Sequence, residues 1–525
     1  GCEVASDGMT ECEVILAVDI GTTACKVAAI GRDGRTRAAA SASYEVDSAV
    51  VEASAGVAEQ SPSGWWAALA SAVRSLLPLG GDARVSAVAL GGMMQCLCLV
   101  DATGAPVRHA MLHNDARATA EAATLEGLAG GAEVVRQRLA NWKGALSFPA
   151  KLRWLLDKEP EVLKRAHTVL LGAHDFVALR LCGAVAADAV TASTTGLLTP
   201  EGGYAFDFLR ELLPDVPTPL EELLPRIVGA DERVGSVSGD AAAALGAPDL
   251  AGVPVFHGCG DAGSATCGVG AGMPGIPYAY MGTSGWVAVT VPRRGPSSPA
   301  AFRLEHPTDG EMVISAAAVM TAGGNLDLLR HVFLCEDGPV PSEGSYAELC
   351  DTAAASEPGS RGVLYMPWLM GERSPFLDPH ARGGFIGLSL TTSRADMCRA
   401  VLEGVAYAFR ALLDAVLPGG PEGAPALVVA GGPTKSQLWM QTMADVLRLR
   451  VQVSGDAEHV GTRGAALLAA RGLGWVSSLG PEGFFPAGPS YEPKPGLAAL
   501  HDERYRIHAG LHAALEGSFR ALAAV

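Results

Sequence analysis

Three glycine-rich turns in this chain contain residue types that bind nucleotides. The first, Asp19-Ile20-Gly21-Thr22-Thr23, follows an apolar run and joins a carboxylate to a glycine and two hydroxyls. A carboxylate binds hydrated Mg²⁺, while backbone N–H groups and hydroxyls bind phosphate. We therefore predict that Asp19 binds the metal and that Gly21, Thr22 and Thr23 contact phosphate. Because Asp begins many tight turns, an ordinary turn is the alternative.

The other two turns lack the acid and predict contacts to phosphate or adenosine alone. Tyr280 stands where an acid would fall before Gly282-Thr283-Ser284-Gly285. Gly431 and Gly432 follow an apolar run and precede an expected helix, although an ordinary strand-to-helix turn has the same pattern. Glycine lets the backbone approach a ligand closely, and a helix N-terminus favours anions. We predict nucleotide contacts at four positions: Gly282, Thr283, Gly431 and Gly432.

The residues around the first two turns predict the same local structure twice. Residues 13–30 read as strand, turn and strand, and residues 278–291 repeat that pattern. A repeated unit indicates an internal duplication, with a ligand cleft expected between the two halves. The other expected elements are strands at 85–90 and 96–100 and helices at 63–77, 149–156 and 502–525.

Composition excludes several classes of function. Of the 525 residues, 49% are hydrophobic and 18% are charged, so the chain can bury large cores and is not a disordered segment. The net charge of −17 argues against nucleic-acid partners and against anionic membrane surfaces. Since no apolar run is long enough to span a bilayer, we expect no membrane partner.

Cysteine usage indicates the cellular compartment, and the absence of other nucleotide-binding motifs excludes two fold classes. The eleven cysteines form no CxxC pair and no Cys/His ligand cluster, and no signal peptide precedes the first strand, so we expect a cytoplasmic protein. The chain starts at Gly1, which leaves an organelle-targeting segment open. No GxxxxGK[ST] occurs and no GxGxxG follows the first strand, which argues against P-loop and dinucleotide-binding folds.

Further segments carry a resemblance to a known family. The most specific is Gly383–Leu388, followed after seven residues by Asp396–Glu403. Tyr365–Pro375 contains Gly-Glu-Arg-Ser-Pro, and residues 256–265 contain Gly-Asp-Ala-Gly-Ser-Ala. Together with the three turns, these segments resemble the FGGY carbohydrate kinases over nearly the whole chain, and within that family the xylulokinases.

The resemblance implies an α/β fold of two ribonuclease-H-like domains, as in actin and hexokinase, with a cleft between them. We expect an N-terminal domain at 13–255, on the sugar and Mg-phosphate side, and a C-terminal domain at 256–525, with the catalytic base and the adenosine side. The resemblance also implies a sugar kinase that uses ATP and Mg²⁺. Its base would be Asp261, although Gly260-Asp261 alone could be a simple turn. Family members are often homodimers, which leaves that assembly open here.

The same resemblance implies the sugar contacts, with two departures. Xylulokinases carry Gly-Gln-Met-His-Gly where this chain has Gly92-Met93-Met94-Gln95-Cys96, and Gln cannot titrate near neutrality as His does. The usual Leu-Trp-Asn-Asp-x-Arg is Leu112-His113-Asn114-Asp115-Ala116-Arg117, which lacks the apolar wall of the Trp. Met94 could be core, and Asp115 with Arg117 could form an internal salt bridge. The predicted sugar contacts are Met94, Gln95, Asn114, Asp115, Arg117 and Asp261.

These departures leave the acceptor open. We expect phosphorylation of a terminal hydroxyl of a pentulose, D-xylulose first, with D-ribulose, L-ribulose, gluconate, glycerol or another polyol as alternatives. A non-catalytic sugar or nucleotide sensor on the same scaffold is a second possibility, against which the presence of Asp19 and Asp261 argues. An actin-like filament or chaperone ATPase is a third, against which the C-terminal signature argues.

Overall fold

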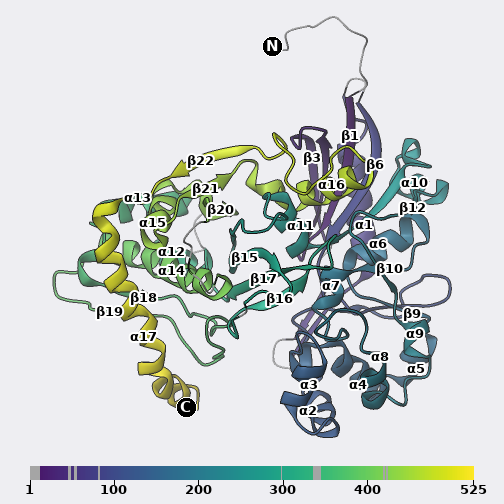
Figure 1. Cartoon of the computed structure of the whole chain (residues 1–525), viewed down its shortest axis with the longest axis horizontal. Helices are drawn as coiled ribbons and strands as arrows, with labels where there is room; N and C mark the ends of the chain where they lie inside the picture. The colour runs from purple at the N-terminus through teal and green to yellow at the C-terminus, as the bar shows by residue number, and fades with distance from the viewer. Residues whose placement is uncertain are drawn as a thin grey trace, which may run out of the picture. The chain divides into compact units, whose positions relative to one another are not determined.

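The computed structural model describes residues 12–44, 49–52, 56–80, 83–296, 298–334, 344–417, 420 and 424–524. They form two compact units, each made of three separate segments of the chain (Figure 1). Unit 1 consists of Gly1–Gly268, Leu304–Gly310 and His459–Phe485, and unit 2 of Val269–Arg303, Glu311–Glu458 and Pro486–Val525. The boundary expected after residue 255 falls inside a strand of unit 1. That strand pairs in parallel with the strand at residues 83–92, so it belongs to the first sheet. The helix that follows it belongs to the same unit.

Unit 1 is built on a six-stranded sheet in the order β12-β13-β6-β1-β2-β3, with three small sheets beside it. Its strands are β1 Cys12–Ile20, β2 Ala24–Gly31, β3 Thr36–Ser43, β4 Ala49–Glu52, β5 Val57–Gln60, β6 Ala83–Gly92, β7 Cys98–Val100, β8 Ala110–Met111, β9 Thr168–Leu170, β10 Ala186–Asp188, β11 Arg226–Val228, β12 Arg233–Ser236 and β13 Pro254–Gly260. Its helices are α1 Pro62–Leu76, α2 Thr119–Leu128, α3 Ala132–Arg138, α4 Phe148–Lys158, α5 Pro160–Arg165, α6 Ala173–Cys182, α7 Ala189–Ser193, α8 Phe206–Leu212, α9 Leu220–Leu223, α10 Gly239–Leu245, α11 Asp261–Gly268 and α16 Val460–Gly472.

Both faces of this sheet are covered, because β1 alternates apolar side chains to either side. Leu16 and Val18 point toward a core that includes Trp65 of α1 and residues of α6 and α10. Ile15 and Ala17 point the other way, into a core formed with alanines of α16. Helix α16, yellow-green in Figure 1, therefore lies beside the purple strands although more than 400 residues of chain separate it from β1.

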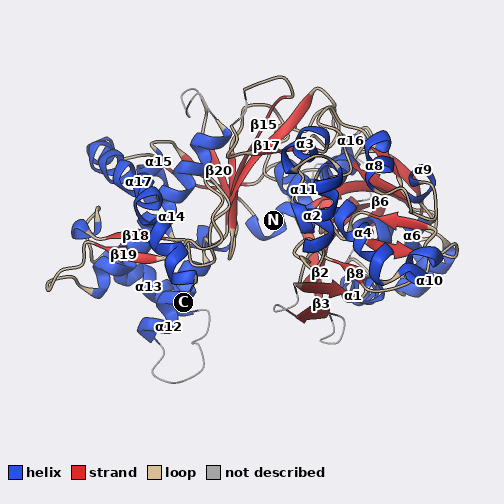
Figure 2. Ribbon diagram, turned by 90° about the horizontal axis from the view of Figure 1, so that it is seen from below, coloured by secondary structure: helices blue, strands red, loops and turns tan. Residues whose placement is uncertain are grey.

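Unit 2 is built on a seven-stranded sheet in the order β16-β17-β15-β14-β20-β21-β22. Figure 2 shows α14, α15 and α17 grouped within this unit, and α14 packs its apolar stripe on β15 and β17. The strands are β14 Tyr278–Met281, β15 Gly285–Pro292, β16 Phe302–Glu305, β17 Met312–Val319, β18 Leu364–Met366, β19 Gly384–Ile386, β20 Leu427–Ala430, β21 Val451–Ser454 and β22 Ala487–Tyr491. The helices are α12 Gly324–Leu334, α13 Gly344–Ala354, α14 Arg394–Val416, α15 Gln437–Leu447 and α17 Ala498–Ala523.

The two large sheets repeat one topology, which confirms the predicted duplication. In unit 1, β3, β2 and β1 form an antiparallel meander, β6 and β13 add in parallel, and β12 closes the edge antiparallel. In unit 2, β17, β15 and β14 form the meander, β20 and β21 add in parallel, and β22 closes antiparallel. Among the described residues, no helix has the length and apolar character needed to cross a lipid bilayer.

Candidate active site

Three adjacent parallel strands of unit 1 bring most of the predicted catalytic segments to one edge. β1 and β13 both pair in parallel with β6, and Gly91 of β6 is in register with Asp19 on one side and Cys259 on the other. Asp261 follows the end of β13, and Met94 follows the end of β6. Because the carboxyl ends of parallel strands meet at one edge, Asp19 and Asp261 flank the same central strand, at spacings of about 5 Å per strand.

Asp261 is the first residue of α11 and retains solvent exposure. Its Oδ1 accepts a hydrogen bond of 2.8 Å from the backbone N–H of Ala262, and this contact stabilises the anion. Crowding by surrounding protein, followed by the negative charge of Asp19, nevertheless raises the pKa of Asp261 to about 7. Water at the exposed edge limits that shift, but its direction gives a carboxylate that accepts a proton readily.

Asp19 is half-buried, and loss of water raises its pKa as well, while the charge of Lys26 lowers it in part. Two neighbouring carboxylates that are both poorly hydrated repel each other, and a bound divalent cation removes that repulsion. Gly461, at the start of α16, leaves room for the Asp19 carboxylate, because a Cβ on Gly461 would lie 2.7 Å from Asp19 Oδ2. The residues at this edge therefore fit Mg²⁺, which the carbohydrate-kinase resemblance implies.

Helix α16 contacts the elements of both carboxylates. Besides facing Asp19, α16 packs closely on α11 through glycines. A Cβ on Gly464 of α16 would lie 1.7 Å from the Ser264 carbonyl oxygen of α11. A Cβ on Gly268 of α11 would lie 1.8 Å from the Val460 carbonyl oxygen of α16. Sequence reasoning missed this helix, since it follows a strand of unit 2. The signal available was the pair Gly461 and Gly464 at the start of an alanine-rich helix.

The first of the three glycine-rich turns, predicted to contact phosphate, is fixed by side chains from two other segments. The hydroxyl of Tyr44 donates to the carbonyl of Gly21 at 2.7 Å, and the amide of Gln60 donates to the carbonyl of Thr22 at 2.8 Å. Thr22 and Thr23 are exposed at the edge where β1 ends. The turn therefore presents its hydroxyls on a backbone that is already held in place.

Met94 and Gln95 lie next to the strand that leads to Asp261. A Cβ on Gly260 would lie 2.1 Å from Cγ of Met94, so this methionine packs directly on the residue before the predicted base. Gln95 is buried in the left-handed region, with φ of 56°, and its amide donates to the Thr194 carbonyl. The structure thus brings together the Met94-Gln95 segment and the end of β13.

The second group of predicted sugar residues forms an internal ion-pair network. Arg117 donates to both carboxylate oxygens of Asp115, at 2.9 Å and 2.6 Å for the shortest contact to each, and also pairs with Glu59 at 2.6 Å. Asp115 is fully buried and also accepts from the N–H of Ala58 at 2.8 Å. The salt bridge left open by the sequence is therefore present, while Asn114 is exposed beside it.

The predicted nucleotide residues of unit 2 converge on one cavity. Gly431, with φ of 109°, sits where a Cβ would be 2.0 Å from the Met281 carbonyl oxygen, which places it against the residue before Gly282. Gly282, Thr283 and Gly432 line a cavity of about 920 Å³. Gly431 itself supports the wall without lining it.

Other lining residues of this cavity were not foreseen. The N–H groups of Gly323 and Gly324 donate to the carbonyls of Gly282 and Thr283 at 2.8 Å and 3.1 Å, so the turn is joined to the start of α12. The sequence signal was the Gly323-Gly324 pair after an apolar strand. The remaining polar lining residues are Asp327, Tyr346, Asp351, Lys435, Ser436 and Gln437.

Comparison with known proteins agrees with this arrangement. The models of the N-terminal and C-terminal domains of the FGGY family of carbohydrate kinases match residues 14–268 and 278–473. The chain belongs to the FGGY family of carbohydrate kinases. This membership confirms the predicted enzyme class, a phosphotransferase that uses an alcohol group of a sugar as acceptor. The N-terminal match ends at residue 268, where the first segment of unit 1 also ends, beyond the expected boundary.

Relatives and solved structures of this FGGY kinase cover most of its length. It is 31% identical to a xylulose kinase of Streptomyces coelicolor, over 87% of each chain. The crystal structure of a xylulose kinase from Rhodospirillum rubrum is 28% identical, with a TM-score of 0.82 over 97% of this chain and all of that one. A gluconate kinase structure from Lactobacillus acidophilus has the same TM-score and coverage at 24% identity, which shows the fold alone. The two actin-like domains predicted from the sequence are thereby confirmed.

Proposed function

We propose that this FGGY kinase transfers the terminal phosphoryl group of ATP to a terminal hydroxyl of a pentulose, D-xylulose, and forms D-xylulose 5-phosphate. The observation that carries the proposal is the alignment of Asp19 and Asp261 on either side of β6, at the carboxyl edge of the sheet. The xylulose kinases at 28–31% identity support the choice of sugar.

Asp261 acts as the general base in this proposal. Its exposed carboxylate would accept the proton of the attacking sugar hydroxyl. In phosphoryl transfer the proton leaves late, so a carboxylate suffices, and a raised pKa strengthens it as a base. Met94 packs on Gly260 and would place the sugar beside the base, with Gln95 behind it.

ATP is held by backbone and hydroxyl groups in the proposal. Gly21, Thr22 and Thr23 of unit 1 and Gly282 and Thr283 of unit 2 would contact phosphates, and the cavity with Gly432 would take the adenosine, with Gly431 behind its wall. Its volume of about 920 Å³ lies within the usual range of small-ligand sites. Mg²⁺, held through Asp19, would neutralise phosphate charge when bound.

A kinase for another acceptor is the second candidate. It is favoured by the chain's own residues: Gln95 replaces the histidine of xylulokinases, and His113 replaces their tryptophan. Discrimination between sugars depends on hydrogen bonds to individual hydroxyls, so a single such change can alter the preferred acceptor.

A panel of acceptors tests both candidates. Purified protein with ATP and Mg²⁺ is assayed for ADP release with D-xylulose, D-ribulose, L-ribulose, D-gluconate and glycerol. We expect the highest kcat/KM with D-xylulose. A higher value with another acceptor would replace the sugar and keep the enzyme class, whereas ADP release that no acceptor stimulates would contradict the kinase itself.

A further inference from the structure

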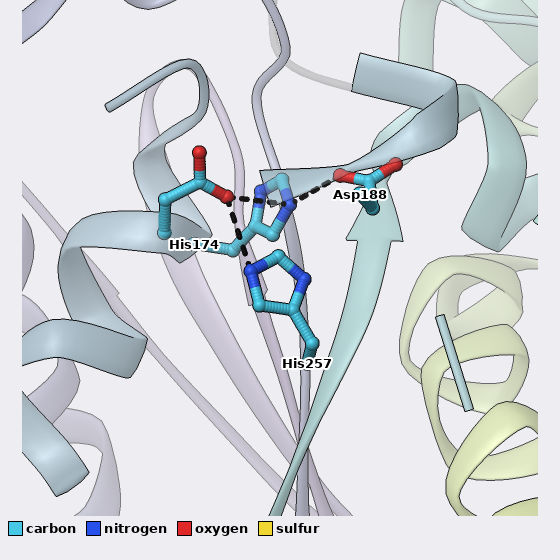
Figure 3. Close-up of side chains that lie close together, drawn as sticks. His174, Asp188 and His257 are labelled. Atoms are coloured by element: carbon cyan, nitrogen blue, oxygen red, sulfur yellow. Dashed lines mark hydrogen bonds and ion pairs between the residues drawn. The ribbon is translucent and has the colours of Figure 1, made fainter. Parts of the chain in front are cut away.

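Four buried ionisable side chains of unit 1 form a cluster that the proposed reaction does not use. His174 and Asp175 stand at the start of α6, Asp188 at the end of β10, and His257 in β13 (Figure 3). All four are without solvent exposure. We call them the His/Asp cluster. Burying two acids with two imidazoles is costly unless their charges are compensated, so the cluster requires a physical explanation.

The potential ligand atoms of the cluster converge on one small volume. Nε2 of His174 lies 2.8 Å from Oδ2 of Asp188 and 3.3 Å from Oδ1 of Asp175. Nε2 of His257 lies 3.4 Å from the same Oδ1 of Asp175. One ligand atom from each of the four residues lies within 4.8 Å of all the others. Figure 3 shows both imidazole rings directed toward this volume, with Asp188 on the side of His174.

Backbone groups hold both carboxylates so that one oxygen of each faces the imidazoles, and that of Asp188 is hydrogen-bonded to His174. Oδ2 of Asp175 accepts from the N–H groups of Leu171 and Gly172, at 2.9 Å and 3.0 Å, whereas its buried Oδ1 makes no hydrogen bond within the described structure. Oδ1 of Asp188 accepts from the N–H of Thr191 at 2.9 Å, which leaves Oδ2 directed at His174. Such second contacts are the usual way in which proteins orient metal ligands.

His257 is surrounded by acceptors, which favours a cation beside it. Its Nδ1 lies 3.3 Å from the carbonyl oxygen of Gly258, a partner that would hold the ring proton there and leave the Nε2 lone pair free. Its Nε2 lies near two oxygens: Asp175 Oδ1 and, at 3.2 Å, the carbonyl oxygen of Ala186. With the ring proton on Nδ1, the Nε2 lone pair faces these oxygens and a cation among them removes the repulsion, whereas with the proton on Nε2 the ring donates a hydrogen bond to Ala186.

We propose that the His/Asp cluster is a Zn²⁺ site. Two neutral imidazoles and two carboxylates cancel the charge of Zn²⁺ and bind it tetrahedrally at about 2.0–2.2 Å. That geometry implies distances of about 3.3 Å between ligand atoms. Of the six pairs of ligand atoms, those at 3.3 Å and 3.4 Å agree with this spacing, and the hydrogen-bonded pair His174–Asp188 at 2.8 Å must separate by about 0.5 Å. The other three pairs lie within 4.8 Å, so the ligands must also draw together around the ion. All four protein ligands are supplied, so the site is structural: it joins α6 and β10 to β13, four residues before Asp261.

The site is tested on the purified full-length chain without nucleotide or sugar, so the outcome is independent of the proposed kinase function. The protein is stripped with a chelator, titrated with Co²⁺ as a spectroscopic probe, and separately loaded with Zn²⁺ and analysed by mass spectrometry. We expect one metal per chain, with the intense visible absorption of tetrahedral Co²⁺. His257→Gln should abolish both signals, whereas His167→Gln, which changes an exposed histidine of the same unit, should retain them.

Two results would overturn the proposal. Absence of tight Zn²⁺ and of the tetrahedral Co²⁺ spectrum in the wild-type chain would mean that protons on the imidazoles compensate the carboxylates instead. Metal binding that His257→Gln leaves unchanged would mean adventitious surface binding. If His257→Gln fails to fold, the wild-type Co²⁺ spectrum still decides, because surface sites give the weak absorption of six-coordinate Co²⁺.

Discussion

Gly464 of α16 and Ser264 of α11 approach so closely that a Cβ on the glycine would lie 1.7 Å from the serine carbonyl oxygen. No side chain larger than hydrogen fits there without moving one of the two helices. The helix that begins with Asp261 is therefore positioned by backbone contact with a helix whose first turn faces Asp19. One helix thus couples the positions of the proposed base and the proposed metal residue.

Replacing Asp261 tests the proposed base. Asp261→Asn keeps the size and the hydrogen bond to Ala262 but cannot accept a proton, so we expect sugar-dependent turnover to fall by about 10²–10⁴-fold. The Tm and the affinity for ATP should stay near wild type. The matched control is Asp240→Asn, another exposed acid in the first turn of a helix of unit 1. Full activity in Asp261→Asn would remove the residue from the chemistry.

The raised pKa of Asp261 predicts how activity depends on pH. A general base works in its ionised form, so kcat/KM for the sugar should be full at high pH and fall as pH is lowered through a pKa that lies above the ordinary aspartate value. An ordinary aspartate would hold its activity to a much lower pH. The measurement is a profile of kcat/KM between pH 5 and 9, flanked by Tm measurements. A flat profile down to pH 5 would mean that the base titrates as an unperturbed carboxyl group.

The space that Gly461 leaves for Asp19 can be filled by one methyl group. In Gly461→Ala the new Cβ would be 2.7 Å from Asp19 Oδ2, so the carboxylate must move. We expect the Mg²⁺ concentration for half-maximal activity to rise several-fold, with little change in Tm. Gly127→Ala in α2 adds the same methyl group in open space and is the control. An unaltered Mg²⁺ titration would argue against Asp19 as the metal residue.

Glu372 of unit 2 predicts a pH dependence of stability. Its Oε1 accepts from the N–H groups of Met320 and Arg373, while its buried Oε2 has no hydrogen-bond partner within the described structure. Burial raises the pKa of Glu372 to about 7, so the folded chain holds a proton that the unfolded chain releases near the ordinary value. Stability is therefore unaffected by this residue below the ordinary glutamate pKa, is lost progressively as pH rises from there to about 7, and falls no further above it.

Glu372→Gln removes that loss, because an amide keeps the acceptor and carries no charge. We expect the variant to be more stable than wild type by on the order of 2 kcal/mol at pH 8 and nearly equal at about pH 4. Thermal or urea unfolding at both pH values measures this, with the exposed Glu357→Gln as control. Equal stability at pH 8 would mean that the Glu372 carboxylate is already satisfied in the folded state.

The hairpins around the Gly-Thr turns could be predicted because their information is local. Apolar strands interrupted by glycine at 13–30 and 278–291 fold as β1–β2 and β14–β15. The helix at 437 and the C-terminal helix follow from periodicity in the same way. Asp261 could be singled out only through the residue pattern around it, since an aspartate after a glycine is by itself a common turn.

The remaining errors and omissions of the sequence predictions involve contacts between segments that are distant in the sequence. The expected domain boundary after residue 255 missed β13, because nothing local distinguishes a strand that pairs back with β6 from one that starts a new domain. The Gly461–Asp19 approach joins segments more than 400 residues apart. For Asp115 and Arg117, the decisive partner is Glu59, which no spacing rule connects to them. The sugar, the homodimer and the cytoplasmic location stay predictions.

The return of α16 to unit 1 has a consequence for biosynthesis. Once residues 1–268 have been synthesised, every strand of the first sheet is present. The sheet face with Ile15 and Ala17 nevertheless remains exposed to solvent until residues 460–472 have been synthesised. The N-terminal half therefore cannot mature as an autonomous intermediate on the nascent chain. Expression of residues 1–268 alone should yield an aggregation-prone product, and co-expression with a segment that carries α16 should improve its recovery.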